Sequence, residues 1–135
     1  MRRKLNVGIF FDQKIGVGGG YYQALNAVRL CAKCQNINAS FKIYTVAKLD
    51  KYPHDFNSFA VEHVTFNILN RTFDRLLRLI RSQRLTKILD KFGLLSTIDR
   101  KAKRDNLDLI YFISPSDIAL DCRRTNFIYT VWDLC

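Results

Sequence analysis

The chain has 135 residues, 48% of them hydrophobic, and a formal net charge of +10 at pH 7. This length can bury the core of one domain, and the composition excludes a disordered protein. No apolar run approaches the roughly 20 residues that span a bilayer, and the apolar stretch after Met1 is too short for a signal peptide. We therefore expect a single domain, residues 1–135, in a cytoplasmic protein that is soluble or peripheral on the inner face of the cell membrane.

The first predicted elements are an apolar strand from about Leu5 to Phe11, a glycine cluster, and a helix from about Tyr21 to Cys34. Gly18, Gly19 and Gly20 lack Cβ atoms and can adopt positive φ, so backbone N–H groups there can approach a phosphate directly. The spacing fits neither the dinucleotide-binding fingerprint nor the phosphate loop of ATPases and GTPases. The alternative is that these glycines only permit a tight turn between strand and helix.

Further strands are predicted along the chain, and helical segments separate several of them. They cover about 41–46, 109–113 and 127–131, with a weaker candidate at 59–66. Strands that alternate with helices indicate an α/β fold, with a Rossmann-like parallel sheet layered by helices.

Polar residues follow several of these strands. Asp12, Ser114, Ser116 and Asp133 all lie just after a predicted strand, beside the expected position of the glycine cluster. In sheets of this kind, ligands bind off the carboxyl ends of the strands. We therefore expect a ligand crevice at that edge, and Ser116 and Asp117 suit the start of a helix there.

A basic segment lies between the third and fourth predicted strands, from Arg71 to Phe92, and carries a net charge of +5. Its apolar residues recur at helical spacing and predict an amphipathic helix with a break. They are Phe73, Leu76, Leu77, Ile80, Ile88, Leu89 and Phe92. The ordinary interpretation is that this apolar face packs on the sheet while the basic residues are solvated.

Two other interpretations of the basic segment stay open. The first is attachment to an anionic membrane surface. It would use Arg75, Arg78, Arg81, Arg84 and Lys87. The second is nucleic-acid binding. A high isoelectric point always makes this a possibility to consider, but no recognition motif in this sequence favours it.

Cysteine and histidine indicate no further chemistry. Cys31 and Cys34 fall near the end of a predicted helix, whereas the cysteines of a redox pair lie at the start of a helix. We therefore expect free thiols. We predict no metal site, because His54 and His63 supply too few ligands for zinc and no Asp-x-Asp pair is present.

Three motifs in order resemble one known family. They are Gly18-Gly-Gly-Tyr-Tyr-Gln-Ala-Leu25, Asp108-Leu-Ile-Tyr-Phe-Ile-Ser-Pro115 and Phe127-Ile-Tyr-Thr-Val-Trp-Asp-Leu134. This arrangement resembles the N-terminal domain of retaining glycosyltransferases of the GT-B fold, in the large family-four group. In that family the N-terminal domain chiefly binds the acceptor, and its glycine loop approaches the diphosphate of the donor. The donor nucleotide is gripped by a C-terminal domain.

The resemblance assigns roles to residues of this chain. Gly18, Gly19, Gly20 and Tyr21 match the donor-diphosphate loop, and the acceptor cleft would contain Asp12, Ser114, Ser116 and Trp132. Where many relatives have His-Asp-Leu, this chain reads Trp132-Asp133-Leu134, so only Asp133 is carried over as a catalytic residue.

The resemblance also predicts the substrates. They are a nucleotide-sugar donor, with no other cofactor, and a glycan or lipid-linked acceptor of the kind used in cell-envelope polysaccharide biosynthesis. The chain ends at Cys135, shortly after a strand, so we expect a truncated domain that is inactive without its missing half. The alternative is a non-catalytic module that binds a phosphorylated ligand or an anionic surface.

Overall fold

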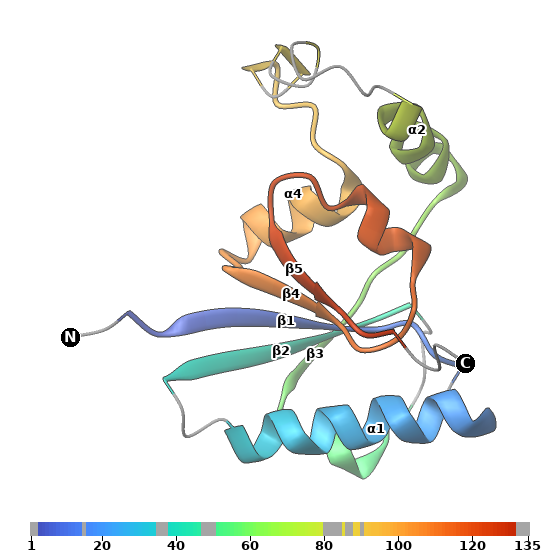
Figure 1. Cartoon of the computed structure of the whole chain (residues 1–135), viewed down its shortest axis with the longest axis vertical. Coiled ribbons are helices and arrows are strands. Elements are labelled where there is room, and N and C mark those ends of the chain that lie inside the picture. Colours follow the sequence, from blue (N-terminus) through green and yellow to red (C-terminus); the bar gives the residue numbers. More distant parts are fainter. Residues whose placement is uncertain are drawn as a thin grey trace.

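The structure is a computed structural model that describes residues 3–14, 16–34, 38–46, 51–79, 85, 88–89 and 91–131. Its centre is a five-stranded sheet in the order β3-β2-β1-β4-β5 (Figure 1). The strands are β1 (Leu5–Phe11), β2 (Ala39–Thr45), β3 (Ala60–His63), β4 (Leu109–Phe112) and β5 (Asn126–Tyr129). Every neighbouring pair is parallel. The predicted α/β fold with a Rossmann-like parallel sheet is confirmed.

Helices cover both faces of the sheet. Helix α1 (Gly18–Lys33) and the short 3₁₀ helix η2 (His54–Phe56) lie on one face, and α4 (Thr97–Arg104) lies on the other (Figure 1). Alternate residues of β1 serve the two faces, as the two-residue period of a strand requires. Ile9 and Phe11 pack in the α1 core, whereas Phe10 packs in the α4 core.

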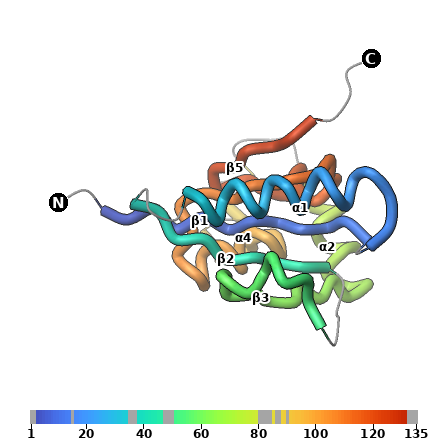
Figure 2. Tube along the Cα trace, turned by 90° about the horizontal axis from the view of Figure 1, so that it is seen from below, coloured from blue at the N-terminus to red at the C-terminus, as the bar shows by residue number. Residues whose placement is uncertain are grey.

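Helix α1 packs on the sheet through an apolar stripe. Val28 lies three residues after Leu25 and four after Ala24, so the three side chains share one side of the helix. Ala24, Leu25 and Val28 have 0%, 5% and 0% of their surface exposed. Figure 2 shows α1 running along the sheet, close to β1 and β2. This contact fixes the turn from β1 into α1, and with it the start of the helix at the sheet edge.

Helix α4 was missed by the sequence-based prediction. Ser96 caps it, because the Ser96 side chain accepts a hydrogen bond of 3.1 Å from the Asp99 backbone N–H. The pattern Ser-x-x-Asp is a known signal for a helix start, but here it lies inside a strongly basic stretch. Ile98 and Ala102 then bury the apolar side of α4 on the sheet.

Where a helix over residues 71–92 is predicted, the structure has helix α2 (Ile68–Leu79). Several residues after α2 lie outside the described part of the chain. The expectation that its apolar face packs on the sheet is wrong. Leu77 is buried, but Leu76 is 57% exposed and Phe92 is 74% exposed. The main neighbour of α2 is the 3₁₀ helix η3 (Asp117–Asp121), which follows β4.

Candidate functional site

The carboxyl ends of β1 and β4 meet at the point where the strand order reverses direction. Chain connections run from β1 outward to β2 and β3 on one side and to β4 and β5 on the other. In open α/β sheets this reversal opens a crevice at the carboxyl edge, where ligands bind. The glycine segment after β1 lies at this edge.

Two predicted site residues come together there. Asp12 follows β1 and Ser114 follows β4, and the Ser114 hydroxyl donates a hydrogen bond to Oδ1 of Asp12. Ser114 is fully buried, whereas Asp12 is half-buried. No hydrogen bond to the second carboxylate oxygen of Asp12 is found among the described residues. Asp12 is therefore oriented by Ser114, and its second carboxylate oxygen can accept a further hydrogen bond.

The glycine segment begins α1 earlier than predicted, at Gly18 instead of Tyr21. Gly16 and Gly18 have positive φ values of 77° and 80°. Gly19 has no positive φ, so the expectation of positive φ is met at Gly18 and not at Gly19. Close packing does not require a glycine at position 19 either, since a Cβ added to Gly19 would meet no atom within 4 Å.

The first turn of α1 presents backbone donors. Val17 occupies the N-cap position without a side-chain hydrogen bond, and the first turn contains no acidic residue. The N–H groups of Gly18, Gly19 and Gly20 have no intrahelical acceptor, as at every helix start, and no other partner for them is found in the described part of the chain. The positive end of the helix dipole adds to these donors. Backbone donors at a helix start of this kind can bind an anion.

Tyr21 and Ser116 are used by the fold itself. Tyr21 is 8% exposed, and its ring meets Phe11 edge-on at a centroid distance of 6.2 Å. Ser116 caps η3, with its hydroxyl accepting a hydrogen bond of 3.4 Å from the Ile118 N–H. The Ser116 N–H in turn donates to the Tyr129 hydroxyl at 3.1 Å. Trp132 and Asp133 lie outside the described residues.

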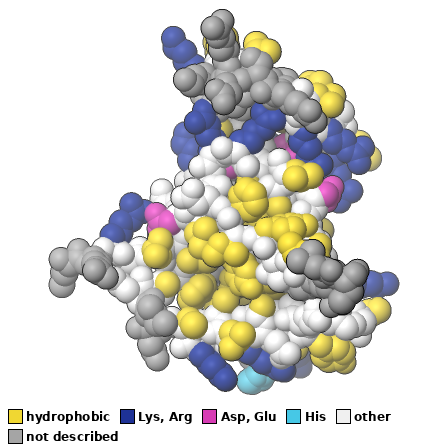
Figure 3. Space-filling model, viewed as in Figure 1, with side chains coloured by type: hydrophobic (Ala, Val, Ile, Leu, Met, Phe, Trp, Pro, Cys, Tyr) yellow, Lys and Arg dark blue, Asp and Glu magenta, His cyan; other side chains and the backbone are white. Residues whose placement is uncertain are grey.

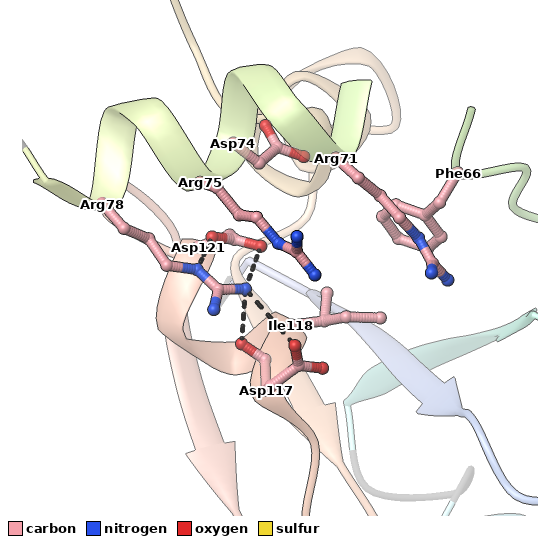
Figure 4. Close-up of a pocket in the computed structure, with 8 residues that line it drawn as sticks. All are labelled: Phe66, Arg71, Asp74, Arg75, Arg78, Asp117, Ile118 and Asp121. Atoms are coloured by element: carbon pink, nitrogen blue, oxygen red, sulfur yellow. Dashed lines mark hydrogen bonds and ion pairs between the residues drawn. The ribbon is translucent and has the colours of Figure 1, made fainter. Parts of the chain in front are cut away.

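The basic residues assigned to a membrane surface divide into three groups. Arg78 is held within the fold: its guanidinium donates two hydrogen bonds to Asp121, of 2.5 and 2.9 Å, and one of 3.0 Å to the Asp117 carbonyl (Figure 4). The bond to Asp121 raises the pKa of Arg78. Arg75 is exposed and has no hydrogen bond or ion pair with the described residues. Arg81, Arg84 and Lys87 lie outside the described part.

A pocket of about 90 Å³ lies between α2 and η3, and no motif in the sequence indicates it. Its charged lining consists of Arg71, Asp74, Arg75, Arg78, Asp117 and Asp121. In Figure 4 the side chains of Arg71 and Arg75 reach from α2 into the space beside Ile118 and Phe66. Asp74 accepts a hydrogen bond of 2.9 Å from the Thr97 N–H, and Asp121 is paired with Arg78. Arg71 and Arg75 are therefore the cations of this pocket that remain available to a ligand.

A second charged cluster joins β2, β3 and α4. Glu62 accepts hydrogen bonds from Lys101 and Arg104 and pairs with Lys42 at 2.7 Å. Asp105 accepts a hydrogen bond of 2.5 Å from the Tyr44 hydroxyl. Burial and this bond to a carboxylate raise the pKa of Tyr44. All these charges are paired within the fold, so the cluster holds α4 on the sheet.

Metal-binding clusters and membrane-spanning helices are not found among the described residues. No group of three or more His, Cys, Asp or Glu side chains there could hold a metal ion. No helix in that part is both long and apolar enough to cross a bilayer. Cys31, Cys34 and Cys122 are free thiols, and burial raises the pKa of Cys31 to about 11.

Comparison with known proteins adds one likeness of fold. No family model matches the chain, and no curated protein matches its sequence. The crystal structure of a glycosyltransferase from Rickettsia africae is similar at a TM-score of 0.49 and 12% sequence identity, over 99% of this chain and 32% of that one. The chain therefore spans about a third of the length of that protein. A likeness this distant supports no conclusion about this chain.

Proposed function

We propose that the chain is the acceptor-side domain of a glycosyltransferase that moves a sugar from a nucleotide-sugar donor to a glycan or lipid-linked acceptor. One observation carries the proposal. The open N–H donors of Gly18, Gly19 and Gly20 lie at the same sheet edge as the hydrogen-bonded pair Asp12 and Ser114. An anion position beside an oriented carboxylate suits a ligand that has both phosphates and hydroxyls. The order of the three sequence motifs supports the same conclusion.

The chemistry of sugar transfer explains why such donors would be useful. When the bond between the sugar and the diphosphate breaks, negative charge grows on the departing phosphate oxygens. Backbone N–H groups held in place by a helix stabilise this charge without having to reorganise. The carboxylate of Asp12 can accept a hydrogen bond from an acceptor hydroxyl. On this proposal, transfer needs the second domain of such an enzyme, which grips the nucleotide.

The alternative function is a module that binds a phosphorylated ligand without turnover. The observation that favours it is that the backbone donors in the first turn of α1 can hold a phosphate by themselves. The two proposals predict the same binding position but differ in turnover. Incubation of the protein as its native cell produces it with labelled nucleotide sugars would distinguish them, because only the transferase would move label to an acceptor.

Binding by this chain alone can be tested by amide NMR. About three hydrogen bonds to a charged group, each near 1.5 kcal/mol, give a dissociation constant on the order of 1 mM. We expect uridine diphosphate or pyrophosphate to shift the amide signals of Gly18, Gly19 and Gly20 first. An absence of shifts at these glycines up to about 10 mM ligand would contradict the anion position.

A substitution makes this test specific. Gly19→Val adds a side chain where the fold has open space, so the protein should remain folded while the new methyl groups obstruct the ligand. Binding should be lost. The control is Gln23→Val, which places the same valine side chain at an exposed position of the same helix one turn later. If Gly19→Val binds the diphosphate as well as the control does, the anion position lies elsewhere.

A further inference from the structure

Helix α2 faces the body of the protein with its polar side. Its buried residues are Asp74 and Leu77. Three polar contacts hold it: Asp74 accepts from the Thr97 N–H, Arg78 pairs with Asp121, and Arg123 donates to the Leu77 carbonyl. The contacts come from α4, from η3 and from the loop after η3. This orientation is the reverse of that of an ordinary surface helix, which buries its apolar side.

The apolar side of α2 is consequently turned to solvent. Ile68 and Leu69 are each 83% exposed, Leu79 is 78% exposed and Leu76 is 57% exposed. Leu69, Leu76 and Leu79 are spaced seven and three residues apart, so they share one side of the helix. Exposed apolar side chains continue after α2. Those described between residues 68 and 94 are Ile68, Leu69, Leu76, Leu79, Leu85, Ile88, Phe92 and Leu94.

Charge indicates what covers this apolar surface. Arg71 and Arg75 are exposed and lie beside it on α2, and neither has an ionic partner in the described part of the chain. The acidic residue of α2, Asp74, is 3% exposed and faces inward. Figure 3 shows Lys and Arg side chains gathered around the end of the molecule where α2 and α4 lie. Asp117, an exposed carboxylate at the same pocket, is paired with Arg78 at 3.7 Å. An apolar surface with two such arginines beside it complements a layer that is apolar inside and anionic at its surface.

We infer that α2 docks on an anionic lipid bilayer, with Leu69, Leu76 and Leu79 in the acyl boundary and Arg71 and Arg75 on lipid phosphates. At 12 residues α2 is about 18 Å long and lies in the plane of the interface. The pocket between α2 and η3 places both guanidinium groups where a headgroup phosphate can enter. Arg78 takes no part in lipid contact, because it holds the helix on Asp121. This inference does not depend on sugar transfer.

The first test is flotation of the full chain with vesicles of phosphatidylglycerol and phosphatidylcholine in equal parts. We expect the protein to float with these vesicles and not with pure phosphatidylcholine. Leu69→Ser combined with Leu76→Ser should reduce binding about tenfold. The matched control is Leu30→Ser combined with Leu120→Ser, two leucines that are 61% and 66% exposed on other elements. An equal loss in both double variants, or no flotation of the unchanged protein, would overturn the inference.

The second test separates the arginines from net charge. Arg71→Gln combined with Arg75→Gln should weaken vesicle binding about tenfold. Lys33→Gln combined with Lys103→Gln removes the same charge from exposed positions on α1 and α4 and should leave binding nearly unchanged. Equal effects would show a nonspecific charge attraction and overturn the assignment to α2.

Two further measurements distinguish lipid docking from self-association and from internal packing of the leucines. Sedimentation should show a monomer for both the unchanged protein and the Leu69→Ser, Leu76→Ser variant. A dimer that disappears in this variant would mean that a second copy covers α2, which contradicts the inference.

The melting temperature of the variant should also equal that of the unchanged protein, since these leucines are exposed. A clear drop would mean that the leucines pack inside the protein and would contradict it equally.

Discussion

Helices α1 and α2 bury opposite sides of themselves. Helix α1 packs its apolar stripe on the sheet, with Ala24 and Val28 at 0% exposure. Helix α2 separates its apolar and charged residues more sharply than α1 does. It is nevertheless attached through Asp74 and Arg78, and it exposes Leu69, Leu76 and Leu79. A strong amphipathic pattern therefore identifies a helix but does not say which side of that helix faces the protein. On our account, α1 serves the fold and the ligand edge, whereas α2 serves a surface outside the molecule.

The largest expected effect tests this difference in burial. Leu25→Ala opens a cavity between α1 and the sheet and should lower the free energy of unfolding by about 2–5 kcal/mol. Leu76→Ala on α2 removes the same atoms from a position that is 57% exposed, and it should change stability by less than about 0.5 kcal/mol. Urea unfolding of both variants measures the contrast. Equal losses would show that the apolar side of α2 is packed in solution.

The next effect concerns the polar attachment of α2. Arg78→Met keeps the aliphatic stem but leaves Asp121, which is 5% exposed, without its cation. We expect a loss of about 1–3 kcal/mol and faster hydrogen exchange in residues 68–79. Arg75→Met is the control on the same helix, because Arg75 has no partner in the described residues. If both variants unfold alike, the Arg78–Asp121 pair does not hold the helix.

A smaller expected effect is a dependence of stability on pH that comes from the α4 face of the sheet. Burial acts to raise the pKa of Glu62, but hydrogen bonds from Lys101, Lys42 and Arg104 outweigh it and hold the pKa at about 2 instead of 4.5. The hydrogen bond from Arg104 likewise lowers the pKa of Asp105. Because both pKa values are lowered in the folded protein, the stabilisation is fully present above about pH 4.5 and is lost as the pH falls toward 2.

This acid effect should appear mainly at α4. We expect stability to fall by on the order of 1 kcal/mol across that pH window, with hydrogen exchange rising in α4 before α1. Glu62→Gln should lower stability at pH 7 and flatten the pH dependence. A pH profile that Glu62→Gln leaves unchanged would show that this cluster does not hold α4.

The smallest expected effect is at the start of α1. Gly19→Ala places a methyl group in open space and removes freedom from the unfolded chain. It should therefore raise the free energy of unfolding by about 0.5 kcal/mol. Thermal unfolding measures the change. A loss of stability would mean that the first turn of α1 is more crowded than the structure shows.

Much of the fold followed from sequence, because buried parallel strands leave a clear signal. The prediction of a strand at Leu5–Phe11 matches β1 in full, and the strand predicted at 109–113 corresponds to β4. The meeting of Asp12 with Ser114 was also predictable, because carboxyl ends of neighbouring parallel strands share an edge. Helix α4 could have been found from Ser96 and Asp99, but the surrounding basic residues obscured its short apolar side.

Other features depended on contacts between distant residues. The partner of Arg78 is Asp121, 43 residues later, and no local pattern links them. Once that pair and the Asp74 contact with Thr97 fix the orientation of α2, Leu69, Leu76 and Leu79 must face outward. Periodicity alone favours the opposite orientation, because burial of apolar residues is the rule. The roles proposed for Trp132 and Asp133 remain predictions from the family resemblance.

Hydrogen–deuterium exchange tests the division of roles between the two helices most directly. Anionic vesicles should slow exchange in residues 68–79 and leave the start of α1 unchanged. Uridine diphosphate should slow exchange at residues 18–21 and leave α2 unchanged. If vesicles leave α2 unaffected, or if one ligand protects both helices to the same extent, the two ends of this domain do not have the separate functions inferred from their opposite burial.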